Sequence, residues 1–273
     1  MIYSLTSVTK QYRAQDGLVR ALDGITFGIR AGECVALIGK SGAGKSTLFR
    51  LLNATQKPTT GSLEFDGSDV GEMSARKLRS MRRSIGTIYQ QHHLVPSLSV
   101  LDNALCGYLG RWTLLQTLRN SVRPARHEVE EAMQVLESVG LADKRRSRAD
   151  QLSGGQQQRL AIARALMNKP DVILADEPVA SLDPALAESI TSLLVNIATE
   201  SKCTLIVSLH AVELARDFFQ RIVALRDGRL AFDVNSNCLD QHILTEVFVN
   251  VSPLERKSAY SDVKHWRRIN CTC

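Results

Sequence analysis

The chain has 273 residues, of which 44% are hydrophobic and 23% charged, close to the averages of globular proteins, and this composition excludes a collagen-like or wholly disordered chain. Lys and Arg outnumber Asp and Glu by 34 to 28, and the resulting charge of +6 suggests polyanionic partners such as nucleic acid, anionic lipid or nucleotide phosphate. Apolar runs such as 34–38 are far shorter than the roughly 20 residues that cross a bilayer, and the first residues do not resemble a secretory signal. We therefore expect a soluble cytosolic protein whose six cysteines are reduced.

Short apolar runs alternate with helical patterns along the chain, which predicts a mostly parallel sheet covered by helices. Antiparallel strands are predicted near the start, at 2–8, 25–30 and 62–66. Parallel strands are predicted at 33–38, 85–89, 171–175, 203–209 and 221–226. Asp66-Gly67 and Asp227-Gly228 indicate tight turns, and helices are predicted at 128–139 and 154–168.

The pattern weakens from Asn235 onward, apart from an apolar patch at 243–251. We therefore expect residues 1–234 to form one domain and residues 235–273 to form an appendage whose order the sequence does not determine. Cys271 and Cys273 form a C-x-C pair that could bind a metal ion, but the pair is isolated and terminal, and we interpret it as inert.

The first chemical motif is Gly-Lys-Ser-Gly-Ala-Gly-Lys-Ser, which matches G-x-x-x-x-G-K-[ST] between a predicted strand and a predicted helix. Glycines let the backbone curl with its N–H groups toward phosphate oxygens, whereas the alternative is a glycine-rich turn with an accidental Lys-Ser. The helix start adds partial positive charge, Lys45 adds a mobile cation, and the Ser46 hydroxyl can ligate Mg²⁺. The predicted phosphate-binding residues are Gly39, Lys40, Ser41, Gly42, Ala43, Gly44, Lys45, Ser46 and Thr47.

Two adjacent acids, Asp176 and Glu177, end the predicted strand 171–175. A carboxylate at the carboxyl end of a parallel strand faces the ligand crevice, which suits Asp176 to hold Mg²⁺ and Glu177 to orient or deprotonate a water molecule. Alone, such a pair would more often be a solvated turn. The phosphate motif earlier in the chain favours the functional interpretation.

Residues 151–159 read Gln-Leu-Ser-Gly-Gly-Gln-Gln-Gln-Arg, and Leu-Ser-Gly-Gly-Gln is the signature of ABC-transporter ATPases. The chain resembles this family over about residues 1–234. Physically, Ser153 is a helix N-cap followed by two glycines, which makes a second anion site. In the family this site contacts the γ-phosphate of ATP on the other subunit, so that two cassettes sandwich two ATP molecules; the matching residues are Ser153, Gly154, Gly155 and Gln156.

The resemblance assigns further roles. Tyr12 resembles the aromatic residue that stacks on adenine, with a half-buried edge-strand tyrosine as the alternative. Gln90 resembles the Q-loop glutamine that contacts Mg²⁺ and water and senses the membrane partner. Asp183, in Ser-Leu-Asp, resembles the D-loop between subunits, and His210 resembles the switch histidine that bridges the γ-phosphate to Glu177. The implied catalytic residues are Glu177, His210, Lys45 and Gln90, and the implied Mg²⁺ ligands are Ser46, Gln90 and Asp176.

The family fold is an α/β P-loop NTPase cassette with a mostly parallel sheet core, an N-terminal antiparallel β subdomain and a helical subdomain, here at about 91–168. The resemblance implies ATP and Mg²⁺ as cofactors and a homodimer that couples ATP-driven closure to transmembrane permease subunits. It places the chain peripherally on the cytoplasmic face of the cell membrane, linked indirectly to a periplasmic substrate-binding protein. It implies no nucleic-acid partner.

Three short segments indicate which members of this family the chain resembles most. Val179 and Ala180 in the segment 176–184, together with 148–151 and 110–118, are similar to phosphonate-import ATPases. This similarity predicts the ATP-hydrolysing subunit of an importer for phosphonates or related phosphorus oxyanions. The alternatives are an importer of polar amino acids, an exporter, and a nucleic-acid-associated ATPase that uses its basic surface. The basic clusters at 76–83 and 144–148 are interpreted as solvated helix faces, with attraction to anionic lipid headgroups as the functional alternative.

Overall fold

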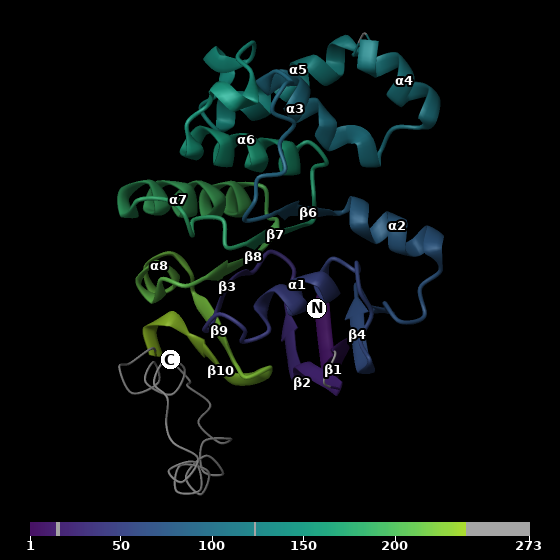
Figure 1. The fold of residues 1–273 in the computed structure, drawn as a ribbon, viewed down its shortest axis with the longest axis vertical. Helices are drawn as coiled ribbons and strands as arrows, with labels where there is room; N and C mark the ends of the chain where they lie inside the picture. The colour runs from purple at the N-terminus through teal and green to yellow at the C-terminus, as the bar shows by residue number, and fades with distance from the viewer. Residues whose placement is uncertain (15–16, 123, 239–273) are drawn as a thin grey trace, which may run out of the picture.

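The computed structural model describes residues 1–14, 17–122 and 124–238 (Figure 1). The apolar patch predicted at 243–251 and the Cys271–Cys273 pair lie outside the described residues.

The N-terminal sheet is antiparallel, with strand order β2-β1-β4-β5. Its strands are β1 (Tyr3–Ala14), β2 (Gly17–Ile29), β4 (Thr60–Phe65) and β5 (Ser68–Asp69). The predicted antiparallel strands are confirmed, but β1 and β2 extend much further than 2–8 and 25–30. Their pairing shifts register between Leu5 and Gln11, so simple alternation of apolar residues breaks down there and hides the rest of the hairpin.

The second sheet has strand order β10-β9-β3-β8-β7-β6. Its parallel strands are β3 (Cys34–Ile38), β6 (Ile85–Ile88), β7 (Val172–Asp176), β8 (Thr204–Leu209) and β9 (Arg221–Arg226). Helices cover it on both sides, so its central strands are buried throughout and read as continuous apolar runs. β10 (Arg229–Asn235) returns antiparallel to β9 through the predicted turn at Asp227-Gly228, where both residues have positive φ. The expected mostly parallel core is therefore confirmed, with β10 as an unpredicted edge.

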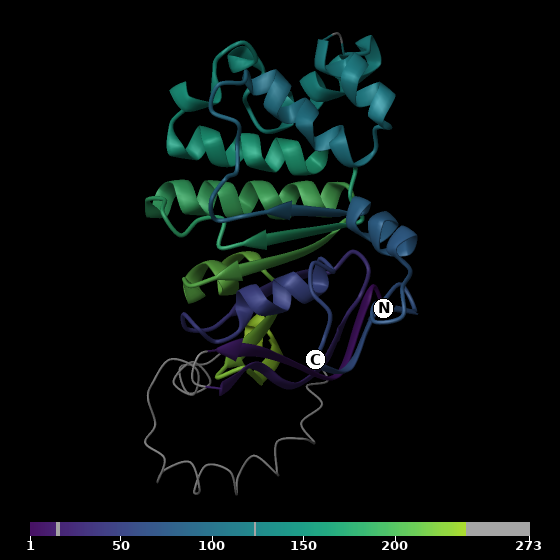
Figure 2. The ribbon, with the colours of Figure 1, turned by 45° about the vertical axis from the view of Figure 1, so that its right-hand side comes forward.

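The helices lie in two places (Figure 2). Those that flank the parallel sheet are α1 (Lys45–Leu52), α2 (Ala75–Arg83), α7 (Pro184–Glu200) and α8 (Val212–Phe218). Those gathered at one end of the molecule are α3 (Val100–Leu105), α4 (Leu114–Val122), α5 (Arg126–Ser138) and α6 (Gly154–Leu166). Short 3-10 turns accompany these helices at Cys106–Gly110, Ala142–Lys144 and Ala149–Gln151, and another follows β10 at Ser236–Cys238. No helix in the described parts of the chain is both long and apolar enough to cross a bilayer.

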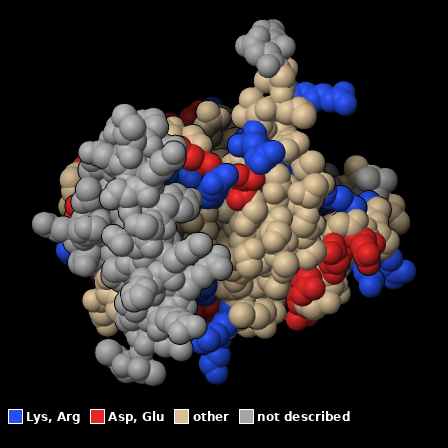
Figure 3. Space-filling model, turned by 90° about the horizontal axis from the view of Figure 1, so that it is seen from below, with Lys and Arg blue, Asp and Glu red and all other residues tan. Residues whose placement is uncertain are grey.

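Charged side chains of both signs lie next to one another on the face seen from below (Figure 3). Arginines of the hairpin β9–β10 form ion pairs with acidic side chains. Arg229 donates to Asp23 at 2.6 Å, and the Arg221 guanidinium contacts both Asp233 and Glu33. The visible described part of this face therefore has mixed charge, although the whole chain is basic.

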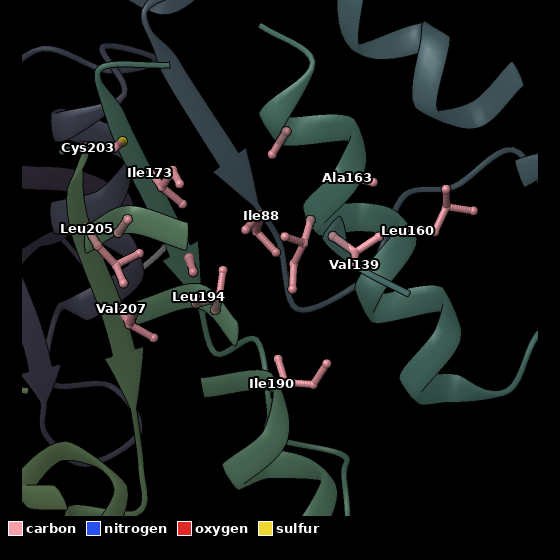
Figure 4. Packing of buried hydrophobic residues seen from close by; sticks show 14 of the residues in the cluster. Ile88, Val139, Leu160, Ala163, Ile173, Ile190, Leu194, Cys203, Leu205 and Val207 are labelled. Atoms are coloured by element: carbon pink, nitrogen blue, oxygen red, sulfur yellow. The ribbon is translucent and has the colours of Figure 1, made fainter. Parts of the chain in front are cut away.

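Two apolar cores share the parallel sheet, one on each face. Along β3, Val35 and Leu37 pack toward α1 and the antiparallel sheet, whereas Ala36 and Ile38 pack toward the other helices. Figure 4 shows this second core, in which strand side chains such as Ile173 and Leu205 point toward α7 and α6. The loops at the carboxyl ends of the strands are thus fixed by close packing beneath them.

Gly107 marks the tightest approach between the 3-10 turn at Cys106–Gly110 and α6. A Cβ at Gly107 would lie 2.2 Å from the Arg164 carbonyl oxygen, whereas one at Gly110 would meet its nearest atom at 3.9 Å. We expect Gly107→Ala to lower the free energy of unfolding by about 2 kcal/mol, because overpacking forces backbone shifts. The control Gly110→Ala should change it by less than about 0.5 kcal/mol in urea denaturation. Equal effects of the two variants would contradict this packing.

Candidate functional site

Three loops meet at the carboxyl edge of the parallel sheet, because β3, β8 and β7 are neighbours that run in the same direction. The loop 39–44 follows β3, the acids Asp176 and Glu177 end β7, and His210 follows β8. Residues more than 160 positions apart in the sequence are therefore brought into one crevice. This edge is where open α/β sheets bind their ligands.

The loop 39–44 requires glycine where it approaches neighbouring backbone. Gly39 has φ 154°, and a Cβ there would lie 2.4 Å from the Leu225 carbonyl oxygen. Gly44 has φ 105°, and its Cβ would lie 2.7 Å from the Ala21 carbonyl oxygen. Gly44 is also the N-cap of α1 and provides no side-chain oxygen, so no side-chain cap competes for the first N–H groups of the helix. The loop therefore fits the predicted phosphate cradle.

Lys45 is 4% exposed and lies between the loop and Glu177. Its Nζ donates to the carbonyl oxygens of Gly39 and Lys40 at 2.8 and 3.3 Å, and lies 3.6 Å from Glu177 Oε1. Burial lowers the pKa of the Lys45 ammonium, and the Glu177 carboxylate opposes that shift. The Lys45 ammonium is thus held inside the loop by two carbonyl oxygens, and the oxygens of an anionic ligand can take their place.

Glu177 joins Lys45 to His210. Its Oε1 lies 2.6 Å from His210 Nε2, and its side chain is 17% exposed against 44% for His210. The Glu177 backbone has φ +50°, a left-handed conformation that is uncommon outside glycine and is often found at functional sites. The predicted catalytic residues Lys45, Glu177 and His210 are therefore in direct contact.

Ser208 on β8 was not identified in the sequence analysis. It is fully buried and lies opposite Asp176 in the β7–β8 register. Its Oγ donates to Asp176 Oδ1 at 2.7 Å and accepts from the Glu177 N–H at 2.8 Å. A serine inside an apolar strand, two residues before His210, was the available signal.

The predicted magnesium ligands come from three elements. Ser46 lies in the first turn of α1, Asp176 ends β7, and Gln90 follows β6, which pairs with β7. Within the described residues, no cluster of three or more His, Cys, Asp and Glu could hold a metal ion by itself. The hydroxyl, carboxylate and amide oxygens present suit a hard cation that keeps part of its water and phosphate shell.

The loop after Gln90 is held by Arg164 of α6, a residue that the sequence analysis did not identify. Arg164 donates to the carbonyl oxygens of His92 and His93 at 2.7 and 2.5 Å. His93 has φ +50°, and its ring lies 5.1 Å from that of Tyr89. Because Arg164 bonds only backbone atoms here, its role follows from tertiary contact and leaves no local motif.

Tyr12 lies on β1, half-buried, opposite Val19 of β2. Its hydroxyl donates to Gln56 Oε1 at 2.5 Å, and Lys10 Nζ lies 5.5 Å from the ring centroid. The same hairpin touches the phosphate loop through Ala21 and Leu22, which lie against Gly44. Tyr12 is thus placed on the strand pair next to the loop.

The signature residues do not lie beside the loop 39–44 of their own chain. They begin α6, which α7 and the parallel sheet separate from α1 (Figure 1). Ser153 and Gln156 cap each other reciprocally, and a Cβ on Gly155 would lie 2.6 Å from Leu186 on α7. Asp183 is the N-cap of α7 and accepts from the Leu186 N–H at 3.0 Å. The signature residues therefore lie outside the crevice.

Two cavities differ in their relation to this crevice. A cavity of about 430 Å³ is lined by Glu177, Ser208, His210 and Leu182. A larger one, about 1050 Å³, lies at the opposite edge of the sheet, near Cys34 and Arg221 at the amino ends of β3 and β9. The smaller cavity, and not the larger one, therefore lies beside the candidate catalytic residues Glu177 and His210.

Comparisons with known proteins converge. The sequence model of the ABC transporter family matches residues 22–180. The chain is 42% identical over 244 residues to the phosphonates import ATP-binding protein PhnC of Wolinella succinogenes, covering 89% of this chain and 87% of that protein. It is 44% identical over 248 residues to PhnC of Frankia casuarinae, covering 90% and 95%.

Solved structures with the same fold include a dimeric ATP-binding cassette bound to ADP and Pi in a post-hydrolysis state. It is 33% identical with a TM-score of 0.74, covering 86% of this chain and 98% of that one. CbiO1 of Clostridium perfringens, part of the transporter complex CbiONQ, is 27% identical with a TM-score of 0.74, covering 98% and 99%. The expected cassette fold is therefore confirmed.

Proposed function

The chain belongs to the ABC transporter family, and we propose that it is the ATP-hydrolysing subunit of an importer for phosphonates or related phosphorus oxyanions. The contact of Glu177 with Lys45 and His210, beside a phosphate cradle, carries the proposal of ATP hydrolysis. Relatives named for phosphonate import, at 42% and 44% identity over about nine tenths of the chain, support the transported solute. We further propose that residues 1–234 form the cassette, with its helical subdomain at about 91–168.

ATP binds through its phosphates to the loop 39–44 and the start of α1. The N–H groups that α1 leaves without a side-chain cap donate to phosphate oxygens, and Lys45 exchanges the carbonyl oxygens of Gly39 and Lys40 for them. Tyr12, on the adjoining hairpin, stacks on the adenine. Since phosphate oxygens carry full charge, this exchange replaces neutral acceptors by stronger charged ones.

Mg²⁺ would be held by Ser46, Asp176 and Gln90, directly or through water. When bound, it neutralises charge on the phosphates. The oxygen donors at these three positions support this assignment.

Hydrolysis uses Glu177 and His210. Glu177 accepts the proton of the attacking water or orients that water, and His210 holds the γ-phosphate. Lys45 neutralises charge that shifts among the phosphate oxygens. Catalysis of this kind depends on positioning and charge neutralisation, so the short contacts among these three side chains matter more than any covalent chemistry.

A second copy of the chain completes each ATP site. Ser153, Gly154, Gly155 and Gln156 lie away from their own phosphate loop, which supports their action on ATP held by the partner, with Asp183 between the subunits. A solved cassette of the same fold that is dimeric and bound to ADP and Pi supports a dimer of this chain. Closure on ATP and reopening after hydrolysis give two states that drive a membrane permease.

The chain acts peripherally, on the cytoplasmic face of the cell membrane. It binds transmembrane permease subunits and is linked through them to a periplasmic substrate-binding protein. Nucleic acid is not a partner in this proposal.

Glu177→Gln tests the chemistry. Loss of the base should lower kcat at least about 100-fold, whereas ATP binding remains because the amide keeps the side chain's size. The bound ATP should trap a dimer, seen by size-exclusion chromatography together with phosphate release. The control Glu200→Gln, at the far end of α7, should behave as wild type. A monomer that hydrolyses ATP at the wild-type rate would contradict the proposal.

Growth of a deletion strain tests which solute is transported. In a host without another phosphonate importer, deletion of the gene should abolish growth on a phosphonate as sole phosphorus source but not on inorganic phosphate. The wild-type gene should restore growth, and Lys45→Ala should not, because the buried cation of the phosphate cradle is lost. Normal growth of the deletion strain on the phosphonate, with loss of polar amino-acid uptake, would favour the alternative importer.

A further inference from the structure

Ser208 is a fully buried polar side chain near the end of β8. Its neighbours in the strand, Val207 and Leu209, are apolar and belong to the core that faces α7. A buried hydroxyl is unfavourable unless both its proton and its lone pairs have partners. Apolar packing alone therefore does not explain a serine at this position.

One oxygen of Ser208 serves both acids of the site. Its hydroxyl proton is committed to Asp176 Oδ1 at 2.7 Å, while a lone pair accepts the Glu177 N–H at 2.8 Å. The parallel register places Ser208 directly opposite Asp176, so the bonds need no displacement of either strand. The Asp176 side chain and the Glu177 backbone thus both form hydrogen bonds with Ser208 Oγ.

The bond to Glu177 supports a backbone conformation that decides where its carboxylate lies. Glu177 has φ +50°, which is unfavourable for a side chain with a Cβ and persists where surrounding bonds hold it. In this conformation Glu177 Oε1 lies 2.6 Å from His210 Nε2 and 3.6 Å from Lys45 Nζ. A different backbone conformation at Glu177 would change the direction in which its side chain leaves the chain, and with it these two distances.

We propose that Ser208 is a positioning residue for the hydrolysis of ATP. It orients the Asp176 carboxylate and holds the Glu177 backbone. Both carboxylates therefore stay in fixed positions relative to the phosphate-binding loop 39–44. This inference rests on the proposed function and adds a residue that touches neither ATP nor the attacking water. Its effect should therefore be on turnover, with ATP binding little changed.

Ser208→Ala is the test, and Ser208→Thr restores the hydroxyl. We expect kcat to fall about tenfold or more in Ser208→Ala, with KM for ATP changed less than about twofold. Ser208→Thr should recover kcat to within about threefold of wild type. In hydrogen exchange of the nucleotide-free protein, the Glu177 amide should exchange at least about tenfold faster in Ser208→Ala, because its acceptor is gone.

The matched control is Thr204→Val, four residues earlier on the same strand. Thr204 is also buried, and its hydroxyl accepts from the Gly32 N–H at 2.9 Å, away from the acids. This variant should keep both kcat and the exchange rate of the Glu177 amide. If Ser208→Ala does not fold, Ser208→Cys, of similar size and with a weaker donor, is measured against the same criteria.

The outcomes separate this inference from the proposed function. A wild-type protein that does not hydrolyse ATP overturns the proposed function and this inference with it. Wild-type hydrolysis with an unchanged kcat in Ser208→Ala overturns the positioning role alone. An equal loss of kcat in Ser208→Ala and Thr204→Val also overturns it, because the effect would then be structural.

Discussion

The buried ammonium of Lys45 is the constraint on which the site depends. Burial of a charged side chain is unfavourable unless the charge has partners. The Lys45 residue is 4% exposed, and its ammonium lies 3.6 Å from Glu177 and donates to two carbonyl oxygens of its own loop. These contacts tie α1 to the end of β7, two elements that meet only because the sheet places β3 and β7 on either side of β8. Glycines at 39 and 44 let the same loop lie against the backbone of Leu225 and Ala21.

The helix α6 extends the site beyond the crevice. It carries the capped signature residue Ser153 at its start and Arg164 in its last turn, where Arg164 holds the carbonyl oxygens after Gln90. The signature residue Ser153 and the loop after Gln90 are therefore both in contact with α6.

The parts of the fold and site with a local pattern were predictable from the sequence. Buried apolar runs predicted all five parallel strands in the described part of the chain. The phosphate loop Gly39–Ser46 was predicted from its motif and the pair Asp176–Glu177 from its place at a strand end, whereas His210 was assigned from the family resemblance. The long β1–β2 hairpin was underestimated because its register shifts break the alternation of apolar residues. Ser208 and Arg164 were missed because their importance lies in contacts across the β7–β8 register and between α6 and a loop. A serine inside an apolar strand is unusual, but neither that serine nor an arginine in a helix indicates which atoms its side chain contacts.

A crystal structure with a non-hydrolysable ATP analogue and Mg²⁺ tests the central claim most directly, because Lys45 must change partners when phosphate binds. The account predicts that Lys45 Nζ leaves the carbonyl oxygens of Gly39 and Lys40 for phosphate oxygens, with Glu177 and His210 still at the same edge of the sheet. An analogue bound elsewhere, such as in the cavity near Arg221, with Lys45 still bonded to its own loop, would contradict the account.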